Sequence, residues 1–238
     1  MKVLVACEES QAVTKELRAL GHEAYSCDLL PCSGEHPEWH FNCDVFEIIK
    51  NKGGELQNGE HAFVKEWDMM IAHPPCTFLA VSGARWYYHP EDKHLPIKKR
   101  RPHPRFPTRA QDRAEAVKFF KALWKAPIKR IVIENPVGIM STIIGKPHQI
   151  VQPYMFGDEA TKTTCLWIKN LPLLEPTNMV SKGERVQFGS GKSMPKWYAD
   201  ALAKAKTAAE RRNLRSKTFK GMARAMAEQW TQGKKAEK

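Results

Sequence analysis

The sequence of 238 residues predicts an α/β protein built on a doubly wound, mostly parallel sheet. Three observations support this fold class. Residues 2–30 give strand, helix and strand signals in turn, which is the opening of such a sheet. Two later apolar runs end in polar residues followed by proline, and ligands bind at this edge of open α/β sheets. Hydrophobic residues make up 42% of the chain, enough for one sizeable core.

The first half of the chain contains three predicted strands. Residues 2–6, KVLVA, predict a short buried strand, and Ser10 is the expected cap of a helix that Gly21 ends. Residues 22–30 predict the second strand, and residues 67–72, WDMMIA, predict the third. The helix has three apolar residues on one face: Val13, Leu17 and Leu20. The third predicted strand, residues 67–72, runs directly into the sequence HPPC at residues 73–76.

The second half predicts further helices and strands. Thr108 and Gln111 fit a capping box that opens a helix, and residues 129–135, KRIVIEN, predict the next strand. Another strand is expected within residues 152–172, followed by a basic helix over residues 195–213. The residues expected to face inward from the first of these helices are Ala114, Val117, Phe120 and Trp124. Each element extends the α/β pattern.

The chain end predicts a last amphipathic helix, capped by Ser216, with one apolar side formed by Phe219, Met222, Met226 and Trp230. The expected organisation is a catalytic unit over 1–170, a short basic target-recognition region over 171–215, this helix within 216–232, and a flexible tail over 233–238. No internal repeat is evident in the sequence.

Residues 83–107 are aromatic, basic and interrupted by prolines, which is typical of a long mobile loop. We call this segment the basic arm. Its aromatic residues Trp86, Tyr87 and Tyr88 either stack on bases or anchor the loop. Because the arm directly follows the HPPC sequence, it is expected to close over whatever binds there.

The net charge of +12 is concentrated in blocks at 98–105 and 204–217. Such blocks favour a polyanionic partner, of which nucleic acid is the commonest, although a solubilising surface is the alternative. No apolar run is long enough to cross a membrane, and an acidic pair interrupts the N-terminal apolar run, so we expect a cytoplasmic protein. Its six scattered cysteines are expected to be reduced thiols.

Cys76 and Glu134 are the residues whose positions most suggest chemistry. Cys76 follows a predicted strand and two stiff prolines, so it is either a rigidly held nucleophile or a small buried apolar residue. Glu134 ends another strand, where burial is expected to raise its pKa so that it donates a proton near neutrality. The alternative for Glu134 is a capping or ion-paired carboxylate.

A second group of residues has the composition of a metal site. Two histidines and three cysteines lie within residues 27–43, and such soft ligands bind zinc. Their spacing misses the usual zinc-knuckle pattern, and Cys27 lies in a predicted strand. We therefore expect no metal. The residues concerned are Cys27, Cys32, His36, His40 and Cys43.

Together, HPPC and the ENP sequence at 134–136 resemble the cytosine carbon-5 DNA methyltransferases, which carry a Pro-Cys nucleophile and a Glu-Asn dipeptide in this order and spacing. Residues 3–28 are similar to the family's cofactor segment, residues 155–164 to the segment that leads to its paired arginines, and residues 217–230 to its C-terminal helix. The resemblance implies a Rossmann-like, seven-stranded methyltransferase fold with S-adenosylmethionine as cofactor.

The resemblance also implies a set of site residues. The catalytic set is Pro75, Cys76, Glu134, Asn135, Lys162 and Thr164. The cofactor-binding set is Cys7, Glu8, Ser10, Asp28, Leu29, Asp44 and Pro74. The nucleic-acid-binding set is Ser82, Arg85, Lys98, Lys99, Arg100, Arg101 and Lys192. DNA is the implied partner of a monomeric enzyme, with a flipped base attacked by Cys76.

The chain departs from the family pattern in two places. Its cofactor turn, residues 6–13, has no glycine, and Ala160, Lys162 and Thr164 stand where the family has glutamine and two arginines. Two alternatives therefore remain. One is a relative that acts on RNA or a free nucleotide, or that transfers a different one-carbon group. The other is a DNA-binding protein on the same fold without catalysis.

Overall fold

A seven-stranded, mostly parallel central sheet organises the protein, seen in a computed structural model that describes residues 1–232 except for the side chains of residues 208, 209 and 212. β9 runs antiparallel to both β7 and β8, and the other neighbouring strands are parallel. In spatial order the strands are β3 (His40–Phe41), β2 (Glu23–Cys27), β1 (Lys2–Ala6), β6 (Met69–Ala72), β7 (Arg130–Asn135), β9 (Thr164–Lys169) and β8 (Gln149–Val151). This mixed α/β arrangement confirms the predicted fold class at that level and is compatible with a Rossmann-like fold.

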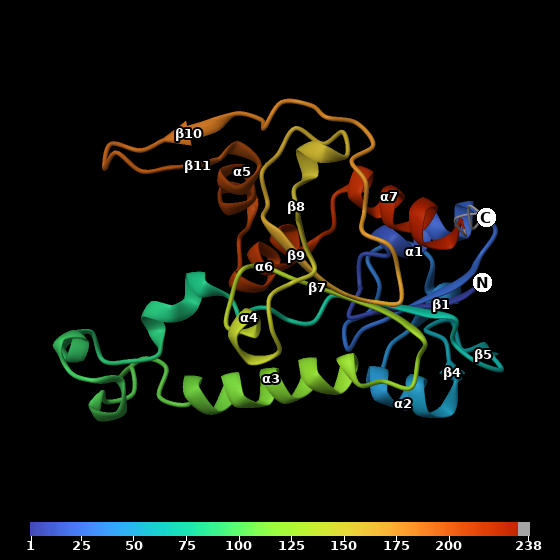
Figure 1. Cartoon of the computed structure of the whole chain (residues 1–238), viewed down its shortest axis with the longest axis horizontal. Coiled ribbons are helices and arrows are strands. Elements are labelled where there is room, and N and C mark those ends of the chain that lie inside the picture. Colours follow the sequence, from blue (N-terminus) through green and yellow to red (C-terminus); the bar gives the residue numbers. More distant parts are fainter. Residues whose placement is uncertain (233–238) are drawn as a thin grey trace.

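Helices cover both faces of the sheet (Figure 1). One face packs against α2 (Val45–Asn51) and α3 (Arg109–Trp124), and the other against α1 (Ala12–Ala19) and α7 (Lys220–Thr231). Successive strand residues point to opposite faces, so Leu4 of β1 lies in the first core and Val5 in the second. Burial of both faces explains why the strands read as continuous apolar runs.

The remaining elements lie outside this sheet. Two small hairpins pair β4 (Gly53–Glu55) with β5 (His61–Phe63), and β10 (Arg185–Gln187) with β11 (Ser193–Pro195). The short helix α4 (Met140–Ile143) follows β7. In Figure 1 the β10–β11 hairpin and the basic arm both project from the same end of the molecule. Residues 1–232 contain no helix of the length and apolar character that a membrane span requires.

The start of α1 differs from the prediction. Gln11, in a left-handed conformation with φ of 57°, is the residue before the helix, and Ser10 does not cap it. Instead, the carboxylate of Glu8 caps the helix: it accepts hydrogen bonds from the backbone N–H groups of Val13 (2.6 Å) and Thr14 (3.2 Å) in the first turn. A longer acidic side chain four residues upstream therefore replaces the expected serine cap.

The start of α3 also differs. Thr108 has helical backbone angles and makes no capping hydrogen bond, because its hydroxyl instead donates to Asp112. The capping-box prediction is therefore wrong. Phe120 is fully buried and Val117 and Trp124 pack against the core, as expected, whereas Ala114 is exposed.

Two helices occupy the region predicted as one basic helix. α5 (Lys196–Lys204) ends at Ala205, and a capping box between Thr207 and Glu210 starts α6 (Ala208–Ser216). Ser216 therefore ends α6 instead of capping the last helix, and α7 begins after Phe219. The predicted apolar side of α7 is confirmed, since Met222, Met226 and Trp230 are buried. The predicted tail, 233–238, lies outside the described residues.

Candidate active site

Backbone hydrogen bonds hold together the two loops that follow β6 and β7. The N–H of Val81 donates to the carbonyl of Val137 (3.0 Å), and the N–H of Ile139 donates to that of Leu79 (2.9 Å). Gly138 is required at this contact, since a Cβ there would lie 2.1 Å from the Leu79 carbonyl oxygen. The loop that carries Cys76 is therefore fixed relative to the end of β7, where Glu134 lies.

Side chains join the two loops as well. Asn135 is buried, and its Nδ2 donates to the carbonyl of Pro74 at 2.8 Å. His73 Nδ1 lies 2.7 Å from Glu134 Oε2, and both side chains are largely buried. Asn135 Oδ1 and His73 Nε2 are buried and have no hydrogen-bond partner in the described part of the chain. Unpaired buried polar atoms are costly and are concentrated at functional sites.

The His73 contact changes the expected titration of Glu134. Burial alone raises the pKa of this carboxyl group, but the hydrogen bond from His73 and the charges of Lys162 and His73 outweigh burial and lower the pKa overall. The predicted raised pKa is therefore wrong. The pKa of His73 is lowered by burial and raised more strongly by Glu134 and Glu8, so it lies above the usual histidine value. The two side chains therefore form a buried ion pair in which the protonation of one residue affects the pKa of the other.

Cys76 is exposed and has opposing charges around it. The surrounding walls and the Glu134 carboxylate raise the pKa of the thiol, whereas the positive charges of Lys162 and Arg215 lower it, and the net effect is a raised pKa. The thiolate is the nucleophilic form of cysteine. These cations therefore favour the reactive state of Cys76, although they do not make it dominant.

The segment before β9 forms one wall of the site. Lys162 Nζ donates to the carbonyls of Ser216 (3.2 Å) and Lys217 (3.1 Å) at the end of α6. Thr164 is buried, and its hydroxyl donates to the carbonyl of Lys162. Both residues are thus held beside Cys76, Lys162 as a cation and Thr164 as a support for the segment.

The ends of β1 and β2 form the other half of the site. Cys7 has φ of 59°, so the glycine-free turn adopts a left-handed conformation there. Asp28 follows β2, and its Oδ1 accepts a hydrogen bond from the N–H of Leu30 (2.9 Å). Burial raises the pKa of Asp28. The buried carboxylate of Glu8 is committed to the start of α1.

A cavity of about 640 Å³, which we call the cleft, connects these two halves. Its volume lies within the range of roughly 300–1,000 Å³ that is typical of small-molecule sites. The predicted catalytic residues that line it are Pro75, Cys76, Glu134, Asn135, Lys162 and Thr164. The predicted cofactor and nucleic-acid residues that line it are Cys7, Glu8, Ser10, Asp28, Pro74 and Ser82. The fold thus gathers residues from positions 7 to 164 around one space.

Other predicted residues lie outside the cleft lining. Leu29 is exposed beside Asp28, and Asp44 starts α2 by accepting a hydrogen bond from the N–H of Phe46. Arg85 stacks on Trp86, and Lys192 is exposed on the β10–β11 hairpin. The remaining four, on the basic arm, are Lys98, Lys99, Arg100 and Arg101.

Ion pairs and turns organise the basic arm. One 3-10 helix, Val81–Trp86, leads into the arm, and two more lie within it at Pro90–His94 and Ile97–Lys99. Buried Asp92 pairs with Arg101 at 2.7 Å, and Arg100 donates to two carbonyls within the arm. Tyr87 is buried between Arg109 and Arg113, so it anchors the arm. Lys98 and Lys99 remain exposed on the last 3-10 helix.

Among the cleft residues that the predicted site sets did not include, His73, Trp197, Tyr198 and Arg215 carry polar or aromatic side chains that bear on the chemistry. His73 directly precedes the prolines, and its position at a strand end was the available signal. Trp197 and Tyr198 come from α5, where no sequence motif marks them, whereas Arg215 of α6 lies in the basic block 204–217 that favoured a polyanionic partner. Only the folded chain brings them to Cys76.

The predicted soft-ligand residues have other partners. Cys27 donates to the Cys43 carbonyl, and His36 stacks on Trp39. His40 is buried, with its ring nitrogens at hydrogen-bond distance from the Ser26 hydroxyl and the Leu30 carbonyl. Within residues 1–232, no group of three or more histidine, cysteine or acidic side chains is placed to hold a metal ion.

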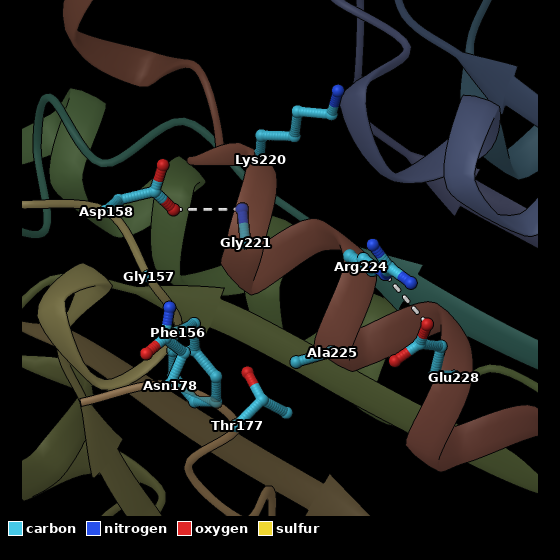
Figure 2. A pocket seen from close by; sticks show the side chains of 10 residues that line it. All are labelled: Phe156, Gly157, Asp158, Thr177, Asn178, Lys220, Gly221, Arg224, Ala225 and Glu228. Carbon is cyan, nitrogen blue, oxygen red and sulfur yellow. Dashed lines mark hydrogen bonds and ion pairs between the residues drawn. The ribbon is translucent and has the colours of Figure 1, made fainter. Parts of the chain in front are cut away.

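A second cavity, of about 480 Å³, lies along α7 (Figure 2). Asp158 Oδ2 accepts a hydrogen bond from the N–H of Gly221, and Arg224 pairs with Glu228 at 2.8 Å. Lys220 extends away from Asn178 on the opposite wall. Since its acidic and arginine side chains serve α7 itself, this cavity is a weaker candidate than the cleft.

Comparison with known proteins adds no assignment: no protein-family model matches the chain, and no curated protein matches it significantly. The functional conclusion therefore depends on the geometry of the cleft.

Proposed function

We propose that this protein is an S-adenosylmethionine-dependent methyltransferase that methylates carbon 5 of cytosine in DNA. The observation that carries the proposal is the cleft, which places Cys76 and the Glu134 carboxyl group beside the strand ends of β1 and β2. A nucleophile and a proton-exchanging pair are needed together for this reaction. The exposed thiol fits a reducing, cytoplasmic setting, and the proposed state is a monomer.

The residues at the ends of β1 and β2 fit the cofactor. Asp28 Oδ1 accepts a hydrogen bond from the N–H of Leu30, and a carboxylate oxygen has more than one lone pair, so the carboxylate would also accept from ribose hydroxyl groups. Leu29 and Leu30 are exposed apolar side chains beside it and would pack against the adenine. When bound there, S-adenosylmethionine would supply an electrophilic methyl group to carbon 5.

The chain's own residues activate the base. The Cys76 thiolate adds to carbon 6, which moves electron density towards carbon 5 and makes it nucleophilic. Glu134 engages ring nitrogen 3, and the proton that this nitrogen gains comes from the His73–Glu134 pair. After methylation, carbon 5 loses its proton to a water molecule, nitrogen 3 returns its proton to the His73–Glu134 pair, and Cys76 leaves as the thiolate. The fixed prolines keep the sulfur on the ring face.

The test is nucleoside analysis of duplex and single-stranded DNA after incubation with the protein and S-adenosylmethionine. The proposal predicts 5-methylcytosine with the natural protein and none with Cys76→Ser, while the variant keeps its affinity for DNA. Methylation by the variant would remove Cys76 as the nucleophile. Methylated RNA or free nucleotide without methylated DNA would reassign the substrate.

A further inference from the structure

The helices α5 and α6 are docked directly on the catalytic unit. Trp197 Nε1 donates to the carbonyl of Thr161 at 3.1 Å, and its ring packs edge-on against Phe219. Lys162 binds the carbonyls of residues 216 and 217, where α6 ends. These contacts fix the last turn of α6 beside Cys76, so its side chains belong to the wall of the cleft.

Arg215 is the cation in this wall. Its guanidinium carbon lies 4.4 Å from the centre of the Tyr198 ring, and both residues line the cleft. Its Nε is buried without a hydrogen-bond partner among the described residues. Stacking on Tyr198 holds the planar group in one orientation while leaving its N–H donors available.

Four acidic residues line the cleft with Arg215, but none of them forms an ion pair with it among the described residues. Of the acidic residues that line the cleft, Glu134 is paired with His73 and Glu8 accepts hydrogen bonds from the start of α1. Arg215 and Lys162 both stabilise the negative form of Cys76, which shows that their charges reach the cleft. Among the described side chains, neither cation forms an ion pair. A ligand with a negative group would complete this part of the site.

We propose that Arg215 binds the phosphodiester group next to the target cytosine. This assignment rests on the proposed function, since it takes the cleft as the place where a flipped nucleotide enters. A guanidinium matches phosphate geometry with two parallel N–H donors, and such charge-assisted hydrogen bonds are strong. Arg215, from α6, thereby supplies a positive charge beside Lys162 and Thr164.

The test measures binding in Cys76→Ser protein, so that no turnover occurs. The probe is a fluorescent single-stranded oligonucleotide with one cytosine, made with an ordinary backbone or with uncharged methylphosphonate on either side of that cytosine. We expect methylphosphonate to weaken binding about tenfold when Arg215 is present. Arg215→Gln should weaken binding of the ordinary probe by a similar factor and respond little to methylphosphonate.

Arg211→Gln is the matched control, since Arg211 is exposed on the same helix and lies outside the cleft lining. Its methylphosphonate effect should equal that of the parent protein. Thermal unfolding of each variant checks that α6 remains folded, and Tyr198→Leu gives a second variant that should reduce the same phosphate effect. Free deoxycytidine monophosphate is added as a competitor to distinguish a terminal phosphate from the DNA backbone.

An equal methylphosphonate effect with and without Arg215 would overturn the assignment, as would a loss with Arg211→Gln as large as with Arg215→Gln. Arg215-dependent binding of the monophosphate without any phosphodiester effect would overturn the DNA backbone as its partner. Failure of the methylation test with an intact Arg215–phosphate effect would remove the proposed reaction alone.

Discussion

At the residue scale, the central feature is a buried pair, His73 and Glu134, behind an exposed nucleophile. Their 2.7 Å contact keeps the carboxylate ionised in spite of burial. The same carboxylate raises the pKa of the Cys76 thiol, because its negative charge disfavours the thiolate. A pyrimidine that takes a proton from the pair would therefore both engage Glu134 and become more electrophilic at carbon 6.

The pair also predicts a pH-dependent stability. The pKa of His73 is raised, so its contribution is complete below the ordinary value of 6.5 and is lost as the pH rises through the folded value. The pKa of Glu134 is lowered, so its contribution is present above 4.5 and is lost as the pH falls through the folded value. The pair therefore stabilises the protein most between these two ordinary pKa values.

His73→Ala should reduce the free energy of unfolding by roughly 3 kcal/mol in that window, because it leaves a buried carboxylate without its partner. The difference from the natural protein should become smaller at alkaline pH. Urea unfolding measured from pH 5 to 9 tests this. His36→Ala, which removes a half-exposed histidine paired with Glu38, is the control. A difference that does not change with pH would contradict the role of the pair.

At the element scale, the basic arm is attached firmly near Cys76 and carries exposed charges farther along its chain. Arg109 is buried, and its Nη2 donates to the carbonyl of Thr77, directly after Cys76. Asp92 holds Arg101 within the arm. Arg100 and Arg101 therefore maintain the shape of the arm through contacts within it, whereas Lys98 and Lys99 are exposed. The mobility predicted for this segment stays a prediction.

Replacing Lys98 and Lys99 by alanine should lower the salt dependence of DNA binding. The magnitude of the slope of log K against log salt should fall by about 1.4 to 1.8, since each lost phosphate contact removes about 0.7 to 0.9. Affinity titrations at several salt concentrations measure the slope. Lys121→Ala with Lys125→Ala, at the opposite end of α3, should leave it unchanged. An unaltered slope in the arm variant would place the contact elsewhere.

Helix starts show why part of the structure escaped prediction. A cap depends on which side chain reaches the free N–H groups, and at α1 this is Glu8 rather than the nearer Ser10. The break between α5 and α6 was visible as Thr207 and Glu210, a capping box within a sequence that otherwise favours one helix. Local patterns thus predicted the helical residues better than their ends.

At the scale of the whole molecule, the sheet and one half of the site could be predicted. Buried strands are short continuous apolar runs; Cys76 follows β6, and Glu134 lies at the carboxyl end of β7. Their meeting depends only on β6 and β7 being neighbours in a parallel sheet. Arg215 and Tyr198 could not be placed, because their position depends on long-range contacts such as Trp197 with Thr161.

The measurement that tests the central claim most directly uses an oligonucleotide containing 5-fluorocytosine, incubated with the protein and S-adenosylmethionine. Fluorine at carbon 5 cannot leave as a proton does, so the methylated intermediate stays bound to the thiol. We expect a stable covalent complex whose modified peptide contains Cys76, which requires S-adenosylmethionine and does not form with Cys76→Ser. A folded protein that binds the oligonucleotide and S-adenosylmethionine but forms no such complex in any sequence context, duplex or single strand, would contradict carbon-5 methylation.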